Sequence, residues 1–302
     1  MTTVATFRCG YAAIVGEPNV GKSTLLNAVL RQKLSIVARK PQTTRQRVLG
    51  ILSTDEAQVI FLDTPGLISP KYLLQEEMLK HAEGALTDAD VVVVLTDVSR
   101  SAELPAEVLQ RISPLKARKP LILVLNKVDK VYKPTVLPMI DRFAKLDLFQ
   151  EIIPLSALKR DNLEAFVRSV EQALPVHPPL YPTDIISEQP ERFFVAEFVR
   201  EKIFEQFREE IPYSTAVDIR EFREQKDKKK TFISADIIVE RDSQKGILIG
   251  SGGESLKRVG SEARRDIERF LERAVYLELT VKVREHWRDD EHALKALGYR
   301  AE

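Results

Sequence analysis

The sequence predicts an α/β chain made of two units: a larger N-terminal unit with a mostly parallel sheet, and a smaller α+β unit at the C-terminus. Three observations lead to this prediction. Short apolar runs alternate with longer amphipathic stretches up to about residue 173, a proline-rich stretch follows, and a second set of helix and strand patterns fills the rest. A length of 302 residues, with 44% hydrophobic and 30% charged residues, suits two globular domains of ordinary size.

The N-terminal part alternates predicted strands with predicted helices. Its strand-length apolar runs cover residues 11–15, 58–62, 91–95, 120–125 and 152–155. The helical stretches cover residues 22–30, 71–85, 103–115, 138–145 and 163–173. Such alternation predicts a mainly parallel sheet covered by helices. Residues 48–53 come so shortly before 58–62 that these two runs predict one antiparallel hairpin.

A proline-rich stretch separates the two predicted domains. Prolines stand at positions 175, 178, 179, 182 and 190, a density that excludes a helix. We therefore expect a domain over residues 1–176, a stiff linker over 177–190 and a second domain over 191–302. In the second domain the patterns predict a helix at 193–207, strands at 215–222 and 231–240, and a solvated turn at 224–230 between the strands. A glycine-rich turn at 246–253, a helix at 254–273, a strand at 275–283 and a short helix at 291–297 follow.

Composition and the N-terminus favour a cytoplasmic protein, which we expect to be a monomer. Residues 1–9 lack the basic start and long apolar stretch of a signal peptide, and the apolar runs at 91–95 and 121–125 are far too short to cross a bilayer. Cys9 is the single cysteine, which excludes an internal disulfide and fits a reducing compartment. With a net charge of +1, any binding of nucleic acid has to rest on local arrangement.

A phosphate-binding loop lies between the first predicted strand and the first predicted helix. Residues 16–23 read GEPNVGKS and fit the pattern G-x-x-x-x-G-K-[ST]. Glycines let the backbone wrap a phosphate, Lys22 is expected to reach the β- and γ-phosphates, and the Ser23 hydroxyl is expected to bind Mg²⁺. A chance glycine-rich turn is the alternative, and the strand before and the helix after argue against it. The predicted phosphate contacts are Gly16, Glu17, Pro18, Asn19, Val20, Gly21, Lys22, Ser23 and Thr24.

Guanine is the predicted base. Asn126-Lys127-Val128-Asp129 follows an apolar strand, where the Asp129 carboxylate can accept hydrogen bonds from N1–H and the exocyclic amine of guanine. Adenine would leave that carboxylate unpaired, at a cost of about 2–4 kcal/mol. Asn126 is expected to contact the other base edge or to brace the phosphate loop, and Lys127 to lay its stem across the base. Ser156, Ala157 and Leu158 follow the next strand, where the Ala157 N–H is expected to meet guanine O6.

The residues expected to sense and hydrolyse the γ-phosphate lie in two loops. Asp63 ends a predicted strand and is expected to hold Mg²⁺ through water, while the Gly66 N–H senses the γ-phosphate. Between the first helix and the hairpin, we favour Thr44 over Thr43 as the threonine that joins Ser23 and Asp63 at Mg²⁺. Loss of the γ-phosphate would then release both loops.

The water-orienting element is missing from its usual place. Leu67 follows Gly66, where GTPases of the Ras type carry a glutamine, and an apolar side chain cannot orient water. Asn19 suggests an alternative, because in related GTPases an asparagine here helps bind a K⁺ ion that stabilises the transition state. We therefore expect K⁺ to stimulate hydrolysis, with Asn19, Lys22, Thr44 and Gly66 acting on the reaction; the alternative is that Asn19 only shapes the loop.

The C-terminal part carries the signature of a KH domain, I-G-x-x-G-x-x-[IL]. Its matching residues are Ile249, Gly250, Gly253 and Leu256, and the element order fits an α+β KH domain of the bacterial type II. In that fold the G-x-x-G loop clamps single-stranded nucleotides. The middle residues of the loop are uncharged, so a purely structural helix junction is the alternative. The predicted RNA contacts are Lys245, Ile249, Gly250, Ser251, Gly252, Gly253, Lys257, Arg258 and Trp287, although core packing is the commoner role for a single tryptophan.

These motifs together resemble the Era family of bacterial ribosome-assembly GTPases over nearly the full length. Beyond the GTPase motifs, the resemblance rests on residues 190–193, 211–214, 239–245 and 281–287, and only one phosphate loop is present. The resemblance implies binding to the 3′ end of 16S ribosomal RNA in the small ribosomal subunit, favoured by the GTP state, during subunit maturation. It also implies peripheral association with the inner membrane. An RNA-binding adaptor with negligible turnover, and an ATPase with an unrelated C-terminal domain, are the alternatives.

Overall fold

The computed structural model describes residues 7–38, 40–101, 103–224 and 230–300. The chain divides into two compact units. The first comprises Met1–Ser35, Thr44–Ser69 and Met78–Glu188, and the second comprises Ile36–Thr43, Pro70–Glu77 and Gln189–Glu302.

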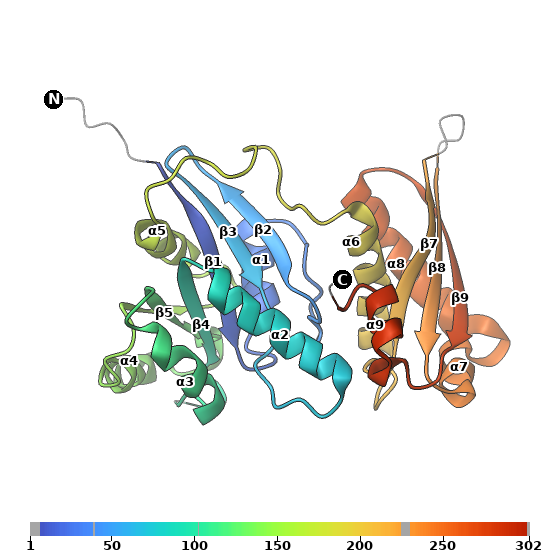
Figure 1. The fold of residues 1–302 in the computed structure, drawn as a ribbon, viewed down its shortest axis with the longest axis horizontal. Coiled ribbons are helices and arrows are strands. Elements are labelled where there is room, and N and C mark those ends of the chain that lie inside the picture. Colours follow the sequence, from blue (N-terminus) through green and yellow to red (C-terminus); the bar gives the residue numbers. More distant parts are fainter. Residues whose placement is uncertain (1–6, 39, 102, 225–229, 301–302) are drawn as a thin grey trace. The chain divides into compact units, whose positions relative to one another are not determined.

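A mixed sheet forms the centre of the first unit (Figure 1). Its strands are β1 (Arg8–Gly16), β2 (Val48–Ser53), β3 (Ala57–Asp63), β4 (Val91–Asp97), β5 (Leu121–Asn126) and β6 (Glu151–Leu155). They are ordered β2-β3-β1-β4-β5-β6, and within this sheet, as far as the structure describes it, β2 and β3 form the antiparallel pair and the other neighbours are parallel. The carboxyl ends of β1, β3, β4 and β5 therefore meet along one edge, where ligands of open α/β sheets bind.

Helices cover both faces of this sheet (Figure 1). They are α1 (Lys22–Leu30), α2 (Leu73–Asp88), α3 (Ala106–Ile112), α4 (Val136–Ala144) and α5 (Leu163–Ala173). Phe61 of β3 stacks on Phe166 of α5, whereas its neighbours Ile60 and Leu62 join a buried cluster with residues of α2, α3 and α4. Alternate side chains of a strand point to opposite faces, so a strand covered on both faces is apolar throughout, as the sequence predicted.

The proline-rich stretch lies along the first unit. The buried side chain of Gln58 accepts hydrogen bonds from the backbone N–H groups of Leu180 and Tyr181, both at 2.9 Å. The N–H of Ile51 in β2 donates to the Ile186 carbonyl at 2.7 Å. Because β2 is an edge strand, this segment covers part of an edge that would otherwise be open to pairing with another chain.

The second unit has its own sheet, with strands β7 (Ala216–Arg223), β8 (Thr231–Val239) and β9 (Val275–Val283). β8 pairs antiparallel with β7 and parallel with β9. The helices are α6 (Glu191–Gln206), α7 (Asp242–Ile249), α8 (Glu254–Leu271) and α9 (Glu291–Ala296). On α8, the buried stripe Val259, Ala263, Ile267 and Leu271 repeats every four residues, which is the spacing of one helix face.

Helix α7 was not predicted. The pattern suggested a turn from residue 246, but Gly246 lies inside α7, and the turn begins only at Gly250, where φ is 73°. A glycine next to a G-x-x-G turn obscured the helix, because glycine normally weakens helices. The expected turn at 224–230 falls mostly on residues 225–229, which lie outside the described residues.

Two segments from the first half of the chain belong to the second unit, which no sequence pattern predicted. The Val37 N–H donates to Glu201 Oε1 of α6 at 2.9 Å, and the fully buried Arg200 donates to the Thr43 carbonyl. Lys40 donates to the carbonyls of Phe204 and Phe207. Val37, Lys40 and Thr43 are thus each hydrogen-bonded to residues of α6.

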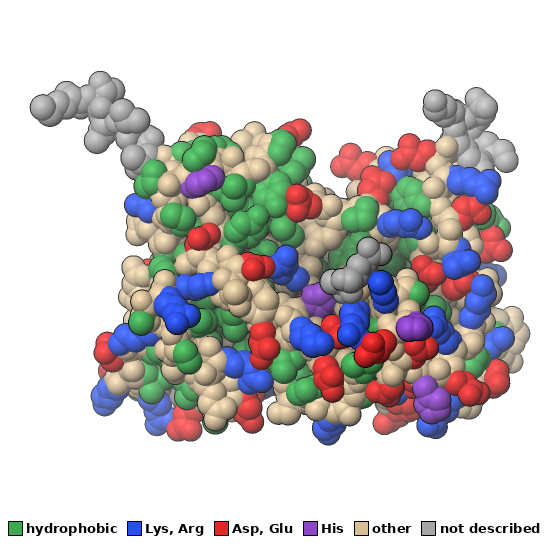
Figure 2. All heavy atoms as spheres, viewed as in Figure 1, with side chains coloured by type: hydrophobic (Ala, Val, Ile, Leu, Met, Phe, Trp, Pro, Cys, Tyr) green, Lys and Arg blue, Asp and Glu red, His purple; other side chains and the backbone are tan. Residues whose placement is uncertain are grey.

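In the part of the chain that the structure describes, we find no helix long and apolar enough to span a membrane. On the face shown in Figure 2, lysine and arginine side chains lie among aspartates and glutamates in each unit. Charge is therefore mixed locally, in keeping with a net charge of +1.

Candidate nucleotide site and nucleic-acid groove

The phosphate loop joins β1 to α1 and has a backbone that only glycine tolerates at two positions. At Gly16 (φ 148°) an added Cβ would lie 2.3 Å from the Leu95 carbonyl oxygen, and at Gly21 (φ 105°) it would lie 2.4 Å from Asn126 Nδ2. Asn19 also has a positive φ, 66°, which asparagine tolerates better than most residues. The neighbouring strands therefore determine the path of this loop.

Lys22 lies at the centre of the loop and is buried. Its ammonium group donates to the carbonyls of Gly16 at 3.2 Å and Glu17 at 2.9 Å. Burial lowers the pKa of Lys22 to about 8, although the charges of Asp63 and Glu17 act in the opposite direction. A phosphate beside this ammonium group would restore its preference for the charged form.

Three residues predicted to bind Mg²⁺ come together. The Ser23 and Thr44 hydroxyls are 3.0 Å apart, and both side chains are buried. Both carboxylate oxygens of Asp63 are buried and have no well-aligned hydrogen-bond partner among the described residues. Burial raises the pKa of Asp63, and the nearby hydroxyls of Ser23, Ser35 and Thr44 and the charge of Lys22 counteract it.

A buried carboxylate without partners costs free energy, which a cation would offset. Two hydroxyls and a carboxylate are oxygen donors of the kind that Mg²⁺ prefers, together with substrate phosphates. The residues present therefore fit Mg²⁺.

Ser35 is a neighbour of this site that the sequence did not reveal. Its hydroxyl is buried and acts on Asp63, although it has no well-aligned hydrogen bond among the described residues. The Asn27 side chain fixes the Ser35 backbone, accepting from its N–H at 3.0 Å and donating to its carbonyl at 2.7 Å. No motif in the sequence marks this serine.

Asn126 braces the phosphate loop, which was one of its two expected roles. Its Nδ2 donates to the Val20 carbonyl at 2.7 Å, and its Oδ1 accepts from the N–H groups of Lys127 at 2.8 Å and Ala157 at 3.1 Å. The Ala157 N–H, expected to meet guanine O6, is thus directed at Asn126 in the structure.

Asp129 has an exposed side chain that Ser156 orients. The Ser156 hydroxyl donates to Asp129 Oδ1 at 2.5 Å and also accepts from the Lys159 N–H at 3.2 Å. Leu158, predicted to lie in the same site, is 69% exposed. The half-buried Thr24 follows Ser23 on α1.

Lys127 lies between the base-recognition loop and the phosphate loop. Its ammonium group donates to the Asn19 carbonyl at 2.7 Å and to Asp97 Oδ2 at 2.6 Å. Asp97 was not predicted to be a site residue. It ends β4 as Asp63 ends β3 and Asn126 ends β5, so its position at the carboxyl end of an apolar strand was the available signal.

Gly66 approaches the phosphate loop closely. An added Cβ would lie 2.7 Å from the Pro18 ring, and the following N–H, of Leu67, donates to the Gly16 carbonyl at 3.1 Å. The Leu67 side chain is 4% exposed and belongs to the core of the first unit. It cannot position a water, as expected from its chemistry.

In the second unit the G-x-x-G loop connects α7 to α8 through glycines with left-handed or related backbones. φ is 73° at Gly250, 58° at Gly252 and 80° at Gly253, and Ser251 and Gly252 are exposed. A Cβ added at Gly252 or Gly253 would meet no atom within 4 Å. The main chain of this loop is therefore open to close approach by a ligand.

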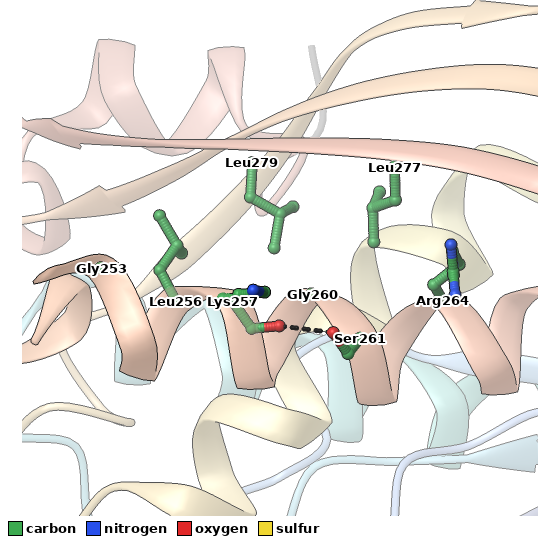
Figure 3. Close-up of a pocket in the computed structure, with 8 residues that line it drawn as sticks. All are labelled: Gly253, Leu256, Lys257, Gly260, Ser261, Arg264, Leu277 and Leu279. Carbon is green, nitrogen blue, oxygen red and sulfur yellow. Dashed lines mark hydrogen bonds between the residues drawn. The ribbon is translucent and has the colours of Figure 1, made fainter.

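A groove beside this loop runs between α8 and β9 (Figure 3). Leu256 of α8 faces Leu277 and Leu279 of β9, and Lys257 and Arg264 stand along its rim. The apolar floor and basic rim suit unpaired bases and a phosphate backbone. Gly260, Ser261, Leu277 and Leu279 were not predicted, although residues 256, 260 and 264 repeat at the four-residue spacing of a helix face.

The remaining predicted RNA contacts flank the loop. Lys257 and Arg258 are exposed, and Arg258 donates to Gln206 at 3.0 Å. Lys245 and Ile249 are half-buried on α7.

The prediction for Trp287 was wrong. The ring is completely buried, its N–H donates to the Ser214 carbonyl at 2.9 Å, and it stacks on Tyr299. A ring enclosed in this way offers no face to a base, so Trp287 holds the C-terminal helix on the domain.

The first unit thus has a phosphate loop, a candidate Mg²⁺ site and a guanine-type recognition loop, and the second has a G-x-x-G loop beside a groove. They define a P-loop GTPase joined to a KH domain. Comparison with known families agrees: residues 11–127 match the family described as 50S ribosome-binding GTPase, and residues 210–288 match the KH domain.

Full-length relatives define the class more closely. The chain is 45% identical over 295 residues to GTPase Era of Geobacter metallireducens, which covers 97% of this chain and 98% of the relative. A solved structure of Era in complex with MgGDPNP and nucleotides 1506–1542 of 16S ribosomal RNA is 43% identical, with a TM-score of 0.94 over 98% of this chain and 100% of that one. Equal values hold for an Aquifex aeolicus Era variant bound to GDP·AlF4⁻. The chain belongs to the Era family of GTPases.

Proposed function

We propose that this GTPase is a slow switch that binds the 3′ end of 16S ribosomal RNA and acts in maturation of the small ribosomal subunit. One observation carries the proposal: a phosphate loop with a candidate Mg²⁺ site and a G-x-x-G loop beside an apolar groove occur in the same chain. The relative solved with MgGDPNP and an RNA fragment, at 43% identity, supports the choice of RNA.

The deciding experiment measures RNA affinity in three states of the protein. A fragment equivalent to nucleotides 1506–1542 would be titrated with protein bound to a non-hydrolysable GTP analogue, to GDP, or to no nucleotide. We expect the GTP-analogue state to bind most tightly, and a fragment of the same length with its unpaired bases sequestered in a duplex to bind weakly in every state. Equal affinity in all three states would contradict the switch.

An RNA-binding adaptor with negligible turnover is the second candidate. Leu67 favours the adaptor, because this buried apolar residue stands where a glutamine would orient the attacking water. Single-turnover hydrolysis of GTP, measured with and without the RNA fragment, separates the switch from the adaptor. A rate that stays at the uncatalysed level even with RNA present would favour the adaptor.

We also propose that Ser23, Thr44 and Asp63 hold Mg²⁺, and that K⁺ assists hydrolysis through Asn19. Hydrolysis would be measured in KCl and in NaCl, for the wild-type protein and for Asn19→Ala. Faster turnover in KCl that disappears in the variant is expected. Equal rates in both salts for both proteins would contradict a role for K⁺.

The domain limits 1–176, 177–190 and 191–302, a monomeric state and peripheral association with the inner membrane stay predictions. Sedimentation analysis tests the monomer. Co-sedimentation with vesicles containing anionic lipid tests the membrane, and protein that remains in the supernatant at low salt would contradict that association.

A further inference from the structure

Asp97 is a buried carboxylate at the ligand-binding edge of the sheet that no motif of the site accounts for. It ends β4 and lies beside Asn126 in the register of β4 and β5. Its side chain is only 4% exposed. Carboxylates are rarely buried to this extent unless they are paired.

Asp97 pairs with Lys127 of the base-recognition loop and with residues of the turn that follows β4. In that turn, Nε of the exposed Arg100 lies 3.4 Å from Oδ2. Oδ2 accepts from Lys127 Nζ at 2.6 Å, and Oδ1 accepts from the Ser99 hydroxyl at 2.6 Å and the Ser99 N–H at 3.0 Å. Burial opposes the charge of Asp97, but the bonds from Lys127 and Ser99 outweigh it and hold the pKa of this carboxyl below its usual value. Asp97 is therefore charged at neutral pH and oriented by both of its oxygens.

Lys127 needs such a partner because its own conformation is unfavourable. Its backbone is left-handed, with φ 67°, which is uncommon for a residue other than glycine. Three bonds hold it in place: its N–H to Asn126, and its ammonium group to Asn19 and Asp97. Of these partners only Asp97 carries a charge that compensates the ammonium group.

We propose that Asp97 is a positioning residue for guanine-nucleotide binding. It anchors the Lys127 ammonium group, so that the lysine stem forms a fixed surface for the base. The same ammonium group then keeps its hydrogen bond to the Asn19 carbonyl of the phosphate loop. Lys127 thus links the base-recognition loop to the phosphate loop before nucleotide binds, so that less conformational entropy is lost on binding. GDP and GTP carry the same base and both bind the phosphate loop, so we expect the affinity for both nucleotides to increase equally.

The test is Asp97→Asn, which keeps the shape and removes the charge. We expect fluorescently labelled GDP and GTP to dissociate about tenfold faster, because a charge-assisted bond in a partly buried site is lost. The rate of hydrolysis at saturating GTP should stay within about twofold, since uniform binding does not change the chemical step. Asp88→Asn is the matched control: Asp88 pairs with Arg47 at the same distance of 2.6 Å but on the surface, and should release nucleotide at the wild-type rate.

A double-mutant cycle with Lys127→Met distinguishes positioning from a general loss of stability. If Asp97 acts through Lys127, the double variant should dissociate nucleotide no faster than Lys127→Met alone. Fully additive effects, or wild-type dissociation from Asp97→Asn, would overturn the proposal. Should Asp97→Asn fail to fold, Ser99→Ala serves in its place: it removes the 2.6 Å bond to Oδ1 from an exposed residue and should accelerate dissociation about two- to threefold. An unchanged rate in Ser99→Ala would then count against the proposal.

Discussion

The phosphate loop and the G-x-x-G loop are both glycine-rich turns that precede a helix, yet glycine serves different purposes in them. In the phosphate loop, Cβ atoms at Gly16 and Gly21 would strike Leu95 and Asn126 within 2.4 Å, so the protein itself occupies the space. In the G-x-x-G loop, a Cβ at Gly250 would lie 2.3 Å from Ser255 Oγ, but Cβ atoms at Gly252 and Gly253 would meet nothing within 4 Å. The first loop is shaped by its own surroundings before ligand arrives, whereas the second is open at Gly252 and Gly253.

The largest expected effect comes from Gly21→Ala. The new Cβ would need to displace Asn126, which braces the loop through Val20, and the alanine would also adopt an unfavourable φ of 105°. We expect GTP affinity to fall at least about 100-fold, a loss of about 3 kcal/mol. Equilibrium titration with labelled GTP measures it.

Gly252→Ala is the matched change in the other loop. It adds the same methyl group at a left-handed glycine with open space around it, so GTP affinity should not change, and RNA affinity should fall only about fivefold. If both alanine variants bound GTP as the wild type does, the distinction between the two loops would be wrong.

The next effect concerns base selection by Asp129. Asp129→Asn replaces an acceptor with a donor toward guanine, so affinity for GTP should fall by about 2–3 kcal/mol while xanthine nucleotide gains. Competition between GTP and XTP for the protein measures the shift. Asp147→Asn, which changes an exposed carboxylate paired with Lys116, is the control and should keep the preference for GTP. Unchanged preference in Asp129→Asn would remove Asp129 from base recognition.

RNA binding should be sensitive to filling of the groove between α8 and β9. In Gly260→Val, side-chain atoms would enter the groove from α8, where even a Cβ already lies 3.4 Å from Leu279. We expect RNA affinity to fall about tenfold while GTP hydrolysis without RNA is unchanged, as base stacking in such a groove contributes about 1–3 kcal/mol per base. Fluorescence anisotropy with the RNA fragment reports it. Gly246→Ala, a helical glycine on α7 with open space around it, should bind RNA normally; equal loss in both variants would indicate a general effect on the domain.

The smallest effect is a pH dependence confined to the nucleotide site. In the free protein, Lys22 has a pKa of about 8, so its charged fraction falls as pH rises through that value. Phosphates favour the charged form, so binding above pH 8 should take up a proton and affinity should weaken as pH rises. Calorimetric titration of GDP at pH 8.5 in two buffers of different ionisation enthalpy detects the proton. Identical binding enthalpies in the two buffers would contradict the lowered pKa.

Sequence was most informative where a local pattern and a chemical requirement coincide. The helix at 22–30 and the strand at 275–283 were predicted to the residue, because the phosphate motif and alternating side chains define their limits. Contacts between distant residues were not predictable. Asp97, Ser35 and Leu277 carry no motif, and only the fold brings them to their sites. Trp287 shows the converse, since its sequence neighbours are basic but its spatial neighbours are the core.

The hydrogen bonds between residues 37–43 and helix α6 bear on how the protein is made. Val37 and Glu201 are 164 positions apart, and Arg200 follows Thr43 by 157. At a synthesis rate of about 5–20 residues per second, roughly 10–30 seconds separate the emergence of these partners. The segment leading to Thr44 therefore acquires these hydrogen bonds long after its own synthesis, and a polypeptide that ends before α6 would lack the partners that secure it.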